Sequence, residues 1–95
     1  MIVAVLRLEL ILHAPDSLKE KRQIVRKILD RCRARFPVSA AETGLQELLR
    51  RSELAFVVVG NEASRLQGIL SRLEDEIGQI GLADVSERFT ELLHY

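Results

Sequence analysis

The segment 2–12, IVAVLRLELIL, constrains the fold of this chain more than any other stretch. Every even position in it is apolar, whereas the odd positions mix apolar and charged residues. A period of two with one uniformly apolar face is typical of a β-strand that lies with that face on a core. A second apolar segment, 53–59, contains no polar residue from Leu54 onward. We expect these two segments to form the central strands of a sheet.

Two segments that follow these strands have helical spacing. Ser17 can cap the first helix, and Glu20 three residues later completes a capping box; we expect this helix to run to about Arg35. The second helix is predicted over about 62–79, with Asn61 as its cap. Each helix carries one apolar stripe, which predicts that it packs on the sheet. The stripes comprise Leu18, Val25, Ile28, Leu29, Cys32 and Phe36, and then Leu66, Leu70, Leu73, Ile77 and Ile80.

Two more polar segments, 37–43 and 82–93, complete the pattern as less buried strands, and the connection 44–51 has leucines spaced for a helical turn. The order strand, helix, strand, strand, helix, strand is the split β-α-β motif taken twice. We therefore predict an α+β, ferredoxin-like sandwich that spans residues 1–95 as one domain. Its four-stranded antiparallel sheet should have both helices on one face. The side chains expected in the core are Leu6, Leu8, Leu10, Leu54, Phe56 and Val58.

The charge of the chain is unevenly distributed, although its formal net value is zero. Residues 1–51 carry 11 Lys and Arg against 6 Asp and Glu, for a charge of +5, whereas residues 52–95 carry 3 against 8, for −5. Such asymmetry predicts a basic surface for nucleic acid or an acidic partner. The alternative is that the two halves neutralise each other in the fold. Without a basic leader or a long apolar run, we expect a cytoplasmic protein that does not enter membranes.

Cations crowd the start of the first helix, where they oppose the helix dipole. At about 100° per residue, four basic side chains of this helix fall within one sector of about 60° beside the apolar stripe. They are Lys19, Arg22, Arg26 and Arg33. This column could contact phosphates, with Arg7 close by, or it could be a solvated face paired with the acidic half. The residues predicted to bind nucleic acid or another anion are Ser17, Lys19, Lys21, Arg22, Arg26 and Arg33.

The open face of the predicted sheet is the second feature that suggests a contact surface. An apolar sheet face left in water usually marks an interface. The aromatic rings that stack RNA bases on such sheets are lacking, because Phe56 points to the core. We therefore expect self-association or a protein partner there, unless the C-terminal segment or a loop covers the face. The predicted interface residues are Val3, Val5, Arg7, Ile11, Val57 and Val59.

Catalytic and metal-binding signals are weak. The two histidines, His13 and His94, lie in no ligand-spaced cluster, and Cys32 falls on the apolar stripe as a packed thiol. The acidic run 74–76 is interpreted as a helix surface, and no glycine-rich phosphate loop is present. We predict no metal, no cofactor and no enzymatic activity. An enzyme that acts on a small anionic metabolite at the helix start, residues 17–22, is the least favoured alternative.

Several segments resemble the YlxP family of small bacterial proteins. They are SLKEKR at 17–22, RFPVSAAE at 35–42, Val59-Gly60-Asn61 and the opening pattern Val-x-x-Leu-Arg-Leu-Glu-Leu at 3–10. The resemblance implies a ferredoxin-like fold in a domain of unknown function. Genes of this family often lie among those for transcription and translation factors, which implies a role around RNA or the ribosome. Relatives often carry Trp where this chain has Leu48-Leu49, and the second helix and last strand match loosely.

Two functional hypotheses follow. The first is an RNA- or ribosome-associated binding module that uses the basic first helix. The second is a homodimer, or a domain that docks a protein partner, through the open sheet face.

Overall fold

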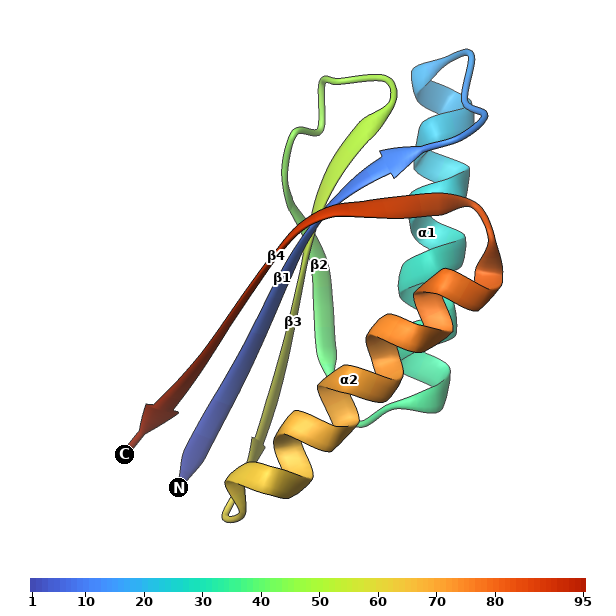
Figure 1. The fold of residues 1–95 in the computed structure, drawn as a ribbon. Helices are drawn as coiled ribbons and strands as arrows, with labels where there is room; N and C mark the ends of the chain where they lie inside the picture. The colour runs from blue at the N-terminus through green and yellow to red at the C-terminus, as the bar shows by residue number, and fades with distance from the viewer.

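The fold is described from a computed structural model that covers residues 1–95. Along the chain a strand, a helix, two strands, a second helix and a last strand follow one another, in the predicted order (Figure 1). The sheet is antiparallel with the strand order β2-β3-β1-β4. The predicted ferredoxin-like α+β class is thereby confirmed. The elements are β1 (Ile2–Leu12), α1 (Leu18–Arg35), β2 (Ser39–Gly44), β3 (Arg51–Gly60), α2 (Ala63–Ile80) and β4 (Ala83–His94).

The two apolar strands occupy the centre of the sheet because each of them has a face that must be buried. β1 pairs with β3 from Ile2↔Gly60 to Ile11↔Arg51, and with β4 on its other side. The even positions of β1 point to the helices, and all six predicted core side chains of β1 and β3 are buried. Burial of aliphatic and aromatic side chains at about 25 cal/mol per Å² is the main force that holds the helices on this face.

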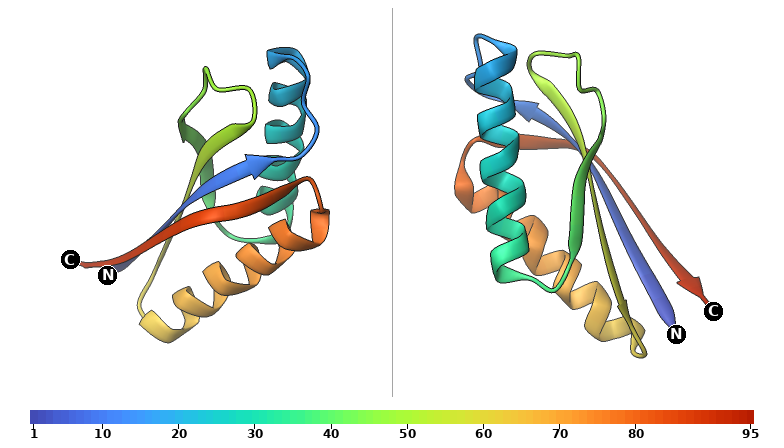
Figure 2. Two further views of the ribbon diagram at one scale, coloured as in Figure 1. Left: turned by 45° about the horizontal axis from the view of Figure 1, so that its top comes forward. Right: turned by 180° about the vertical axis from the view of Figure 1, so that it is seen from behind.

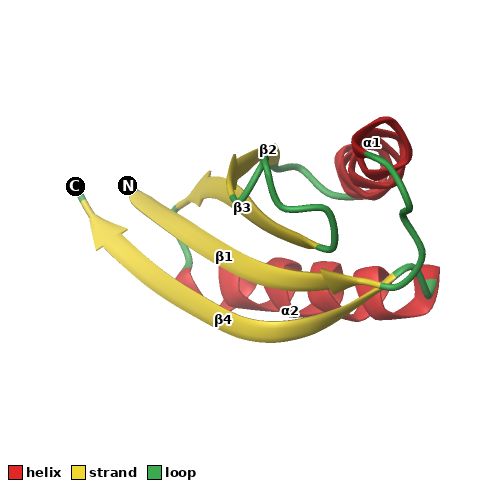
Figure 3. Ribbon diagram, turned by 90° about the horizontal axis from the view of Figure 1, so that it is seen from above, coloured by secondary structure: helices red, strands yellow, loops and turns green.

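Both helices lie on one side of the sheet, and no segment covers the other side (Figure 3). α1 packs beside β2, whereas α2 crosses beneath β1, β3 and β4. The prediction's alternative, in which the C-terminal segment or a loop covers the open face, is therefore wrong. The C-terminal segment instead forms the edge strand β4, and its end lies beside the N-terminus (Figures 1 and 2). The amide of Tyr95 donates to the carbonyl of Met1 at 2.8 Å.

The start of α1 is capped by its own side chains. Ser17 Oγ accepts from the amide of Glu20 at 3.1 Å, as the capping box predicts. The Glu20 carboxylate, however, accepts from the amide of Asp16 at 2.7 Å, one residue earlier than in the standard box. The helix ends at Arg35, and Phe36 is already extended because Pro37 disfavours helical geometry before it.

One local prediction is wrong. Asn61 does not cap α2: the cap residue is Glu62, which makes no side-chain capping bond. Asn61 lies one residue too early for its side chain to reach the amides of the second or third helical residue. The connection 44–51 contains one turn, as its leucine spacing suggests: the Leu48 amide donates to the Leu45 carbonyl at 3.1 Å. Leu45 itself lies in the left-handed region with φ of 59°.

The two helices are 18 residues each, and neither has an apolar stretch long enough to cross a membrane.

Candidate functional site

The basic column of α1 borders a shallow groove against β2, which we call the α1–β2 groove. Its volume is about 290 Å³. Two buried apolar side chains, Val25 and Leu29, form its floor, and three guanidinium groups line it from the same helix. Glu42 of β2 closes the opposite side. The lining guanidinium groups belong to Arg22, Arg26 and Arg33.

Arg22 and Arg26 carry the free charge of this groove. Both side chains are exposed, and neither has a carboxylate within 4 Å. Lys19, one turn before Arg22, is also exposed and unpaired. The structure therefore leaves three of the six predicted anion contacts available along one line of the helix surface.

Arg33 shares the groove, but its guanidinium is already engaged. It donates to the carbonyl of Ala40 on β2 at 2.6 Å and to Asp30 Oδ1 at 3.2 Å. Since it is half exposed, its side chain contributes positive potential to the groove, while its main role in the fold is to hold β2 against α1.

Lys21 is not part of the basic surface, and its predicted role as an anion contact is wrong. The residue is 1% exposed. Its ammonium group donates to the carbonyls of Leu45 at 2.6 Å and Gln46 at 3.1 Å, and lies 3.3 Å from Glu42 Oε2. Lys21 thus fastens the connection after β2 to the helix. The sequence held a sign of this, because position 21 lies three residues after Leu18 and four before Val25, within the apolar stripe.

Two other predicted contributors are also removed from the basic surface. Ser17 is exposed, but its hydroxyl oxygen is used to cap α1. Arg7 lies on the opposite face of the sheet from α1, where it pairs with Glu53 at 3.6 Å and stacks over Phe89 at 4.8 Å from the ring centroid. The expectation that Arg7 lies near the basic helix is therefore wrong, since odd positions of β1 point away from the helices.

The other flank of α1, which faces α2, is neutralised by one carboxylate. Arg35 Nη1 lies 2.7 Å from Glu76 Oε1, and Arg31 Nη2 lies 3.7 Å from Glu76 Oε2. The Glu76 side chain is 7% exposed, so the interpretation of residues 74–76 as a surface run is wrong for this position. Burial, and next the negative charge of Glu76, raise the pKa of the Cys32 thiol to about 11. A thiol held protonated in this way is a packing group and not a nucleophile.

The predicted interface residues all lie on the open face of the sheet, but they do not form one continuous patch. Val3 pairs with Val59 and Val5 with Val57, so that one end of the face is apolar. Towards the other end, Glu9 accepts from Arg51 at 2.7 Å, next to the Arg7–Glu53 pair. Ion pairs thus divide the face, and Ile11 stands beyond them, apart from the valines. The exposed Phe89 of β4 also belongs to this face and was missed, because its strand was expected to alternate only weakly.

The remaining titratable groups form no catalytic arrangement. His13 Nε2 lies 2.8 Å from Asp84 Oδ2 at the exposed end of the sheet. No three His, Cys, Asp or Glu side chains gather in a way that could hold a metal ion. Charge at the α1–β2 groove is therefore the strongest chemical feature of the molecule.

A family model described as a protein of unknown function (DUF503) matches residues 3–88. The chain belongs to this family. It is 32% identical over 65 residues to the uncharacterized protein YlxP of Bacillus subtilis (strain 168), a match that covers 68% of the chain and 71% of that relative. The resemblance to the YlxP family is thereby confirmed.

Solved structures share the fold of this DUF503 chain. The structural-genomics protein YJCS has a TM-score of 0.62 at 12% identity, over 97% of the chain and 99% of that protein. SnoaB, a cofactor-independent oxygenase from Streptomyces nogalater, has a TM-score of 0.51 at 12% identity, over 99% of the chain and 92% of that protein. Similarity at this level of identity shows the fold alone.

Proposed function

We propose that this DUF503 protein is a non-enzymatic module that binds the phosphate backbone of RNA through the α1–β2 groove. The observation that carries the proposal is that most of the unpaired positive charge of the molecule lies on α1. Of 14 Lys and Arg residues, six have no carboxylate within 4 Å, and four of these lie on α1. The six are Lys19, Arg22, Arg26, Lys27, Arg65 and Arg72.

The geometry of the groove suits a chain of phosphates better than a single small anion. Arg22 and Arg26 are four residues apart, which corresponds to about 6 Å along the helix axis. Each guanidinium can donate two parallel hydrogen bonds to a phosphate. Lys19 continues the line by a further turn. A linear series of cations favours a polymer that carries evenly spaced negative charges.

Recognition by this surface should depend little on base sequence. Contacts to phosphates position a nucleic acid but carry no sequence information. Base-specific RNA recognition on a sheet normally uses aromatic stacking, and within the four strands the open face offers only the ring of Phe89, with Arg7 stacked on it. The gene neighbourhood that the resemblance to the YlxP family implies, among transcription and translation factors, supports RNA over other phosphate polymers.

The test is binding of fluorescently labelled single-stranded and duplex RNA, measured by anisotropy at about 50 mM and about 200 mM salt. Two or three phosphate contacts on a single strand predict that log K falls with log salt at a slope of about −1.4 to −2.1. The double variant Arg22→Glu/Arg26→Glu should lose at least about tenfold in affinity at low salt.

The matched control is Arg65→Glu/Arg72→Glu, which makes the same change in net charge on α2. It should retain most of the binding, because these arginines lie away from the groove. Equal loss in both double variants would indicate that only net charge matters, and the absence of binding in the wild type would refute the proposal.

A second candidate function is self-association through the apolar end of the open face. It is favoured by Val57 and Val59, which are 36% and 57% exposed beside Val3 and Val5. Val57→Glu should disperse a dimer, whereas Ala41→Glu, on the same face of β2, should do so less. Light scattering that shows a monomer at high concentration would contradict this candidate.

A further inference from the structure

The two edges of the sheet differ in how well they are protected. An edge strand exposes unpaired backbone N–H and C=O groups, and proteins usually shield these groups. β2 is six residues long, its register shifts between Glu42 and Gly44, and Arg33 donates to its Ala40 carbonyl. β4 is 12 residues long and pairs only with β1. Its register shift lies opposite Glu9/Leu10, so that residues 87–93 form a regular edge without proline or bulge.

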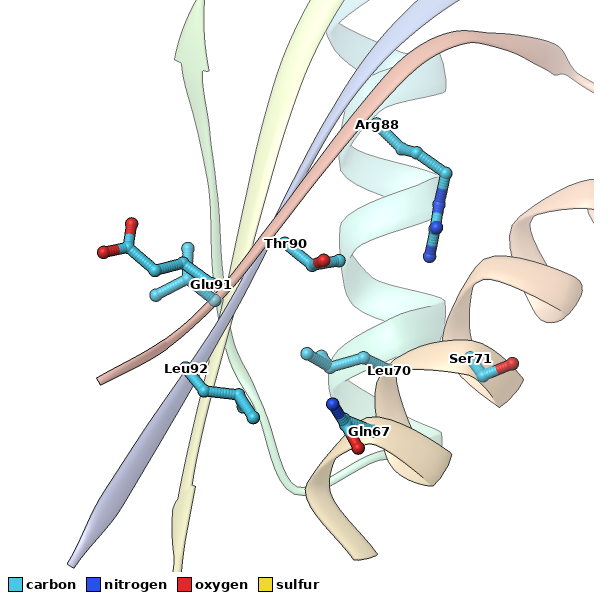
Figure 4. Close-up of a pocket in the computed structure, with 8 residues that line it drawn as sticks. Gln67, Leu70, Ser71, Arg88, Thr90, Glu91 and Leu92 are labelled. Carbon is cyan, nitrogen blue, oxygen red and sulfur yellow. The ribbon is translucent and has the colours of Figure 1, made fainter. Parts of the chain in front are cut away.

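A cavity of about 480 Å³ lies beside this unprotected part of β4, between the strand and α2. In Figure 4, Thr90 and Leu92 of β4 point towards α2, and Leu70 reaches towards them from the helix. Gln67 borders the opening, and Arg88, whose Nε donates to Glu74 at 2.9 Å, closes one end. The apolar lining of the cavity comes from Val5, Leu70 and Leu92, and the rim is polar, so that the cavity suits an apolar side chain of moderate size.

The other face of the same segment carries uncompensated negative charge. Glu87 and Glu91 are both exposed and have no cation within 4 Å. They pair in register with Glu9 and Val5, which places them on the open face of the sheet. In Figure 4 the Glu91 carboxylate extends to the opposite side of β4 from Leu70, although the residue itself also borders the cavity. The cations closest in register are not free, because Arg7 is paired with Glu53 and Arg51 with Glu9.

We propose that residues 87–93 of β4 accept an extended peptide segment of a partner protein as a fifth strand. A strand added there lies about 4.8 Å beyond β4, and its side chains alternate between the two faces. Those on the helix side reach the cavity beside Leu70 and Leu92 and should be apolar. Those on the open side face Glu87 and Glu91 and should be basic. The partner is therefore an extended segment with two basic residues four positions apart and apolar residues next to them.

A second copy of this chain fits the same edge poorly. Antiparallel pairing of two copies of β4 about a two-fold axis would bring Glu87 and Glu91 of each copy onto one side of the joint sheet. Four carboxylates would then lie close together without a free cation, and like charges across strands are destabilising. The charge pattern therefore selects a basic partner over self-pairing.

The test uses a nine-residue synthetic peptide with two lysines four positions apart, leucine on either side of each lysine, and threonine at the remaining positions. The measurements are affinity by fluorescence anisotropy and amide hydrogen exchange of the whole protein. Binding should protect alternate amides within 87–93, because every second residue of an edge strand points its N–H outward. Exchange that stays unchanged in β4, or protection confined to β2, would overturn the proposal.

Two variants separate the charge from the cavity. Glu87→Lys/Glu91→Lys should weaken the lysine peptide at least tenfold and strengthen a peptide with glutamate in place of lysine, whereas Glu47→Lys/Asp75→Lys, the same charge change elsewhere, should do neither. Gln67→Trp should obstruct the cavity and weaken both peptides, whereas Gln79→Trp should not.

Self-association is the competing outcome. If the protein alone shows concentration-dependent association that protects the same β4 amides, the edge is an interface between copies, and the proposal of a basic partner is wrong. The proposal is independent of RNA binding, because Arg22→Glu/Arg26→Glu should leave peptide affinity unchanged.

Discussion

Both flanks of α1 carry arginines, but those on one flank are paired with a carboxylate, whereas Arg22 and Arg26 on the other are not. On the flank that faces α2, Arg31 and Arg35 share the buried carboxylate of Glu76. On the flank that faces β2, Arg22 and Arg26 have no such partner, because the one carboxylate of that strand, Glu42, is already used by Lys21 and Ser52. A cation is therefore free for a ligand only where the neighbouring element brings no spare acid.

The largest expected effect comes from the cation between the flanks. Lys21→Met should lower the free energy of unfolding by about 3 kcal/mol, because it leaves Glu42 and two backbone carbonyls without their buried donor. Urea denaturation measures this loss. A loss below about 0.5 kcal/mol is typical of an exposed site and would contradict the burial of Lys21.

The next effect depends on pH and on the α2-facing flank. Because the pKa of Cys32 is raised to about 11 from an ordinary value of 9.0, folding favours the neutral thiol. Its contribution to the free energy of unfolding is complete below pH 9 and is lost as the pH rises through about 11, by up to about 3 kcal/mol. The Cys32→Ala variant should not show this pH-dependent loss. The measurement is the free energy of unfolding of the wild type and of the variant between pH 9 and pH 11, where the two should diverge. Parallel curves would show that the thiol does not contribute.

Removal of the shared carboxylate tests the comparison directly. Glu76→Ala should cost about 1–2 kcal/mol, less than Lys21→Met, because Arg31 and Arg35 are half exposed and regain water. It should also lower the pKa of Cys32, since Glu76 is the second cause of its elevation. If the same variant gained RNA affinity, the flank would be a binding surface that Glu76 normally masks.

The smallest effect on stability is expected at the groove itself. Arg22→Ala and Arg26→Ala should each change the free energy of unfolding by less than about 0.5 kcal/mol, because neither side chain has an internal partner. Thermal unfolding of each variant measures this. A larger loss would mean that these arginines support the fold, and their part in the proposed RNA contact would need revision.

Prediction from sequence succeeded where a pattern repeats along the chain. Alternation in residues 2–12 and the stripe of α1 identified the strand, the helix and the apolar residues that they bury, but not the buried Lys21. Single-residue expectations were less secure. The cap of α2 was predicted one residue too early, at Asn61. Glu76 was assigned to the surface although it lies between the helices. Phe89 was not associated with the open face, because its strand has no regular pattern of apolar residues.

The sequence by itself determined the ferredoxin-like fold and its core, because apolar periodicity is a local property that each segment carries wherever it packs. Only the tertiary structure decided which cations remain free. Pairing depends on carboxylates that are distant in the chain, as Glu76 is from Arg35, and no spacing rule reports their approach. The same holds for the open edge of β4, which exists because no further strand of this chain lies beside it.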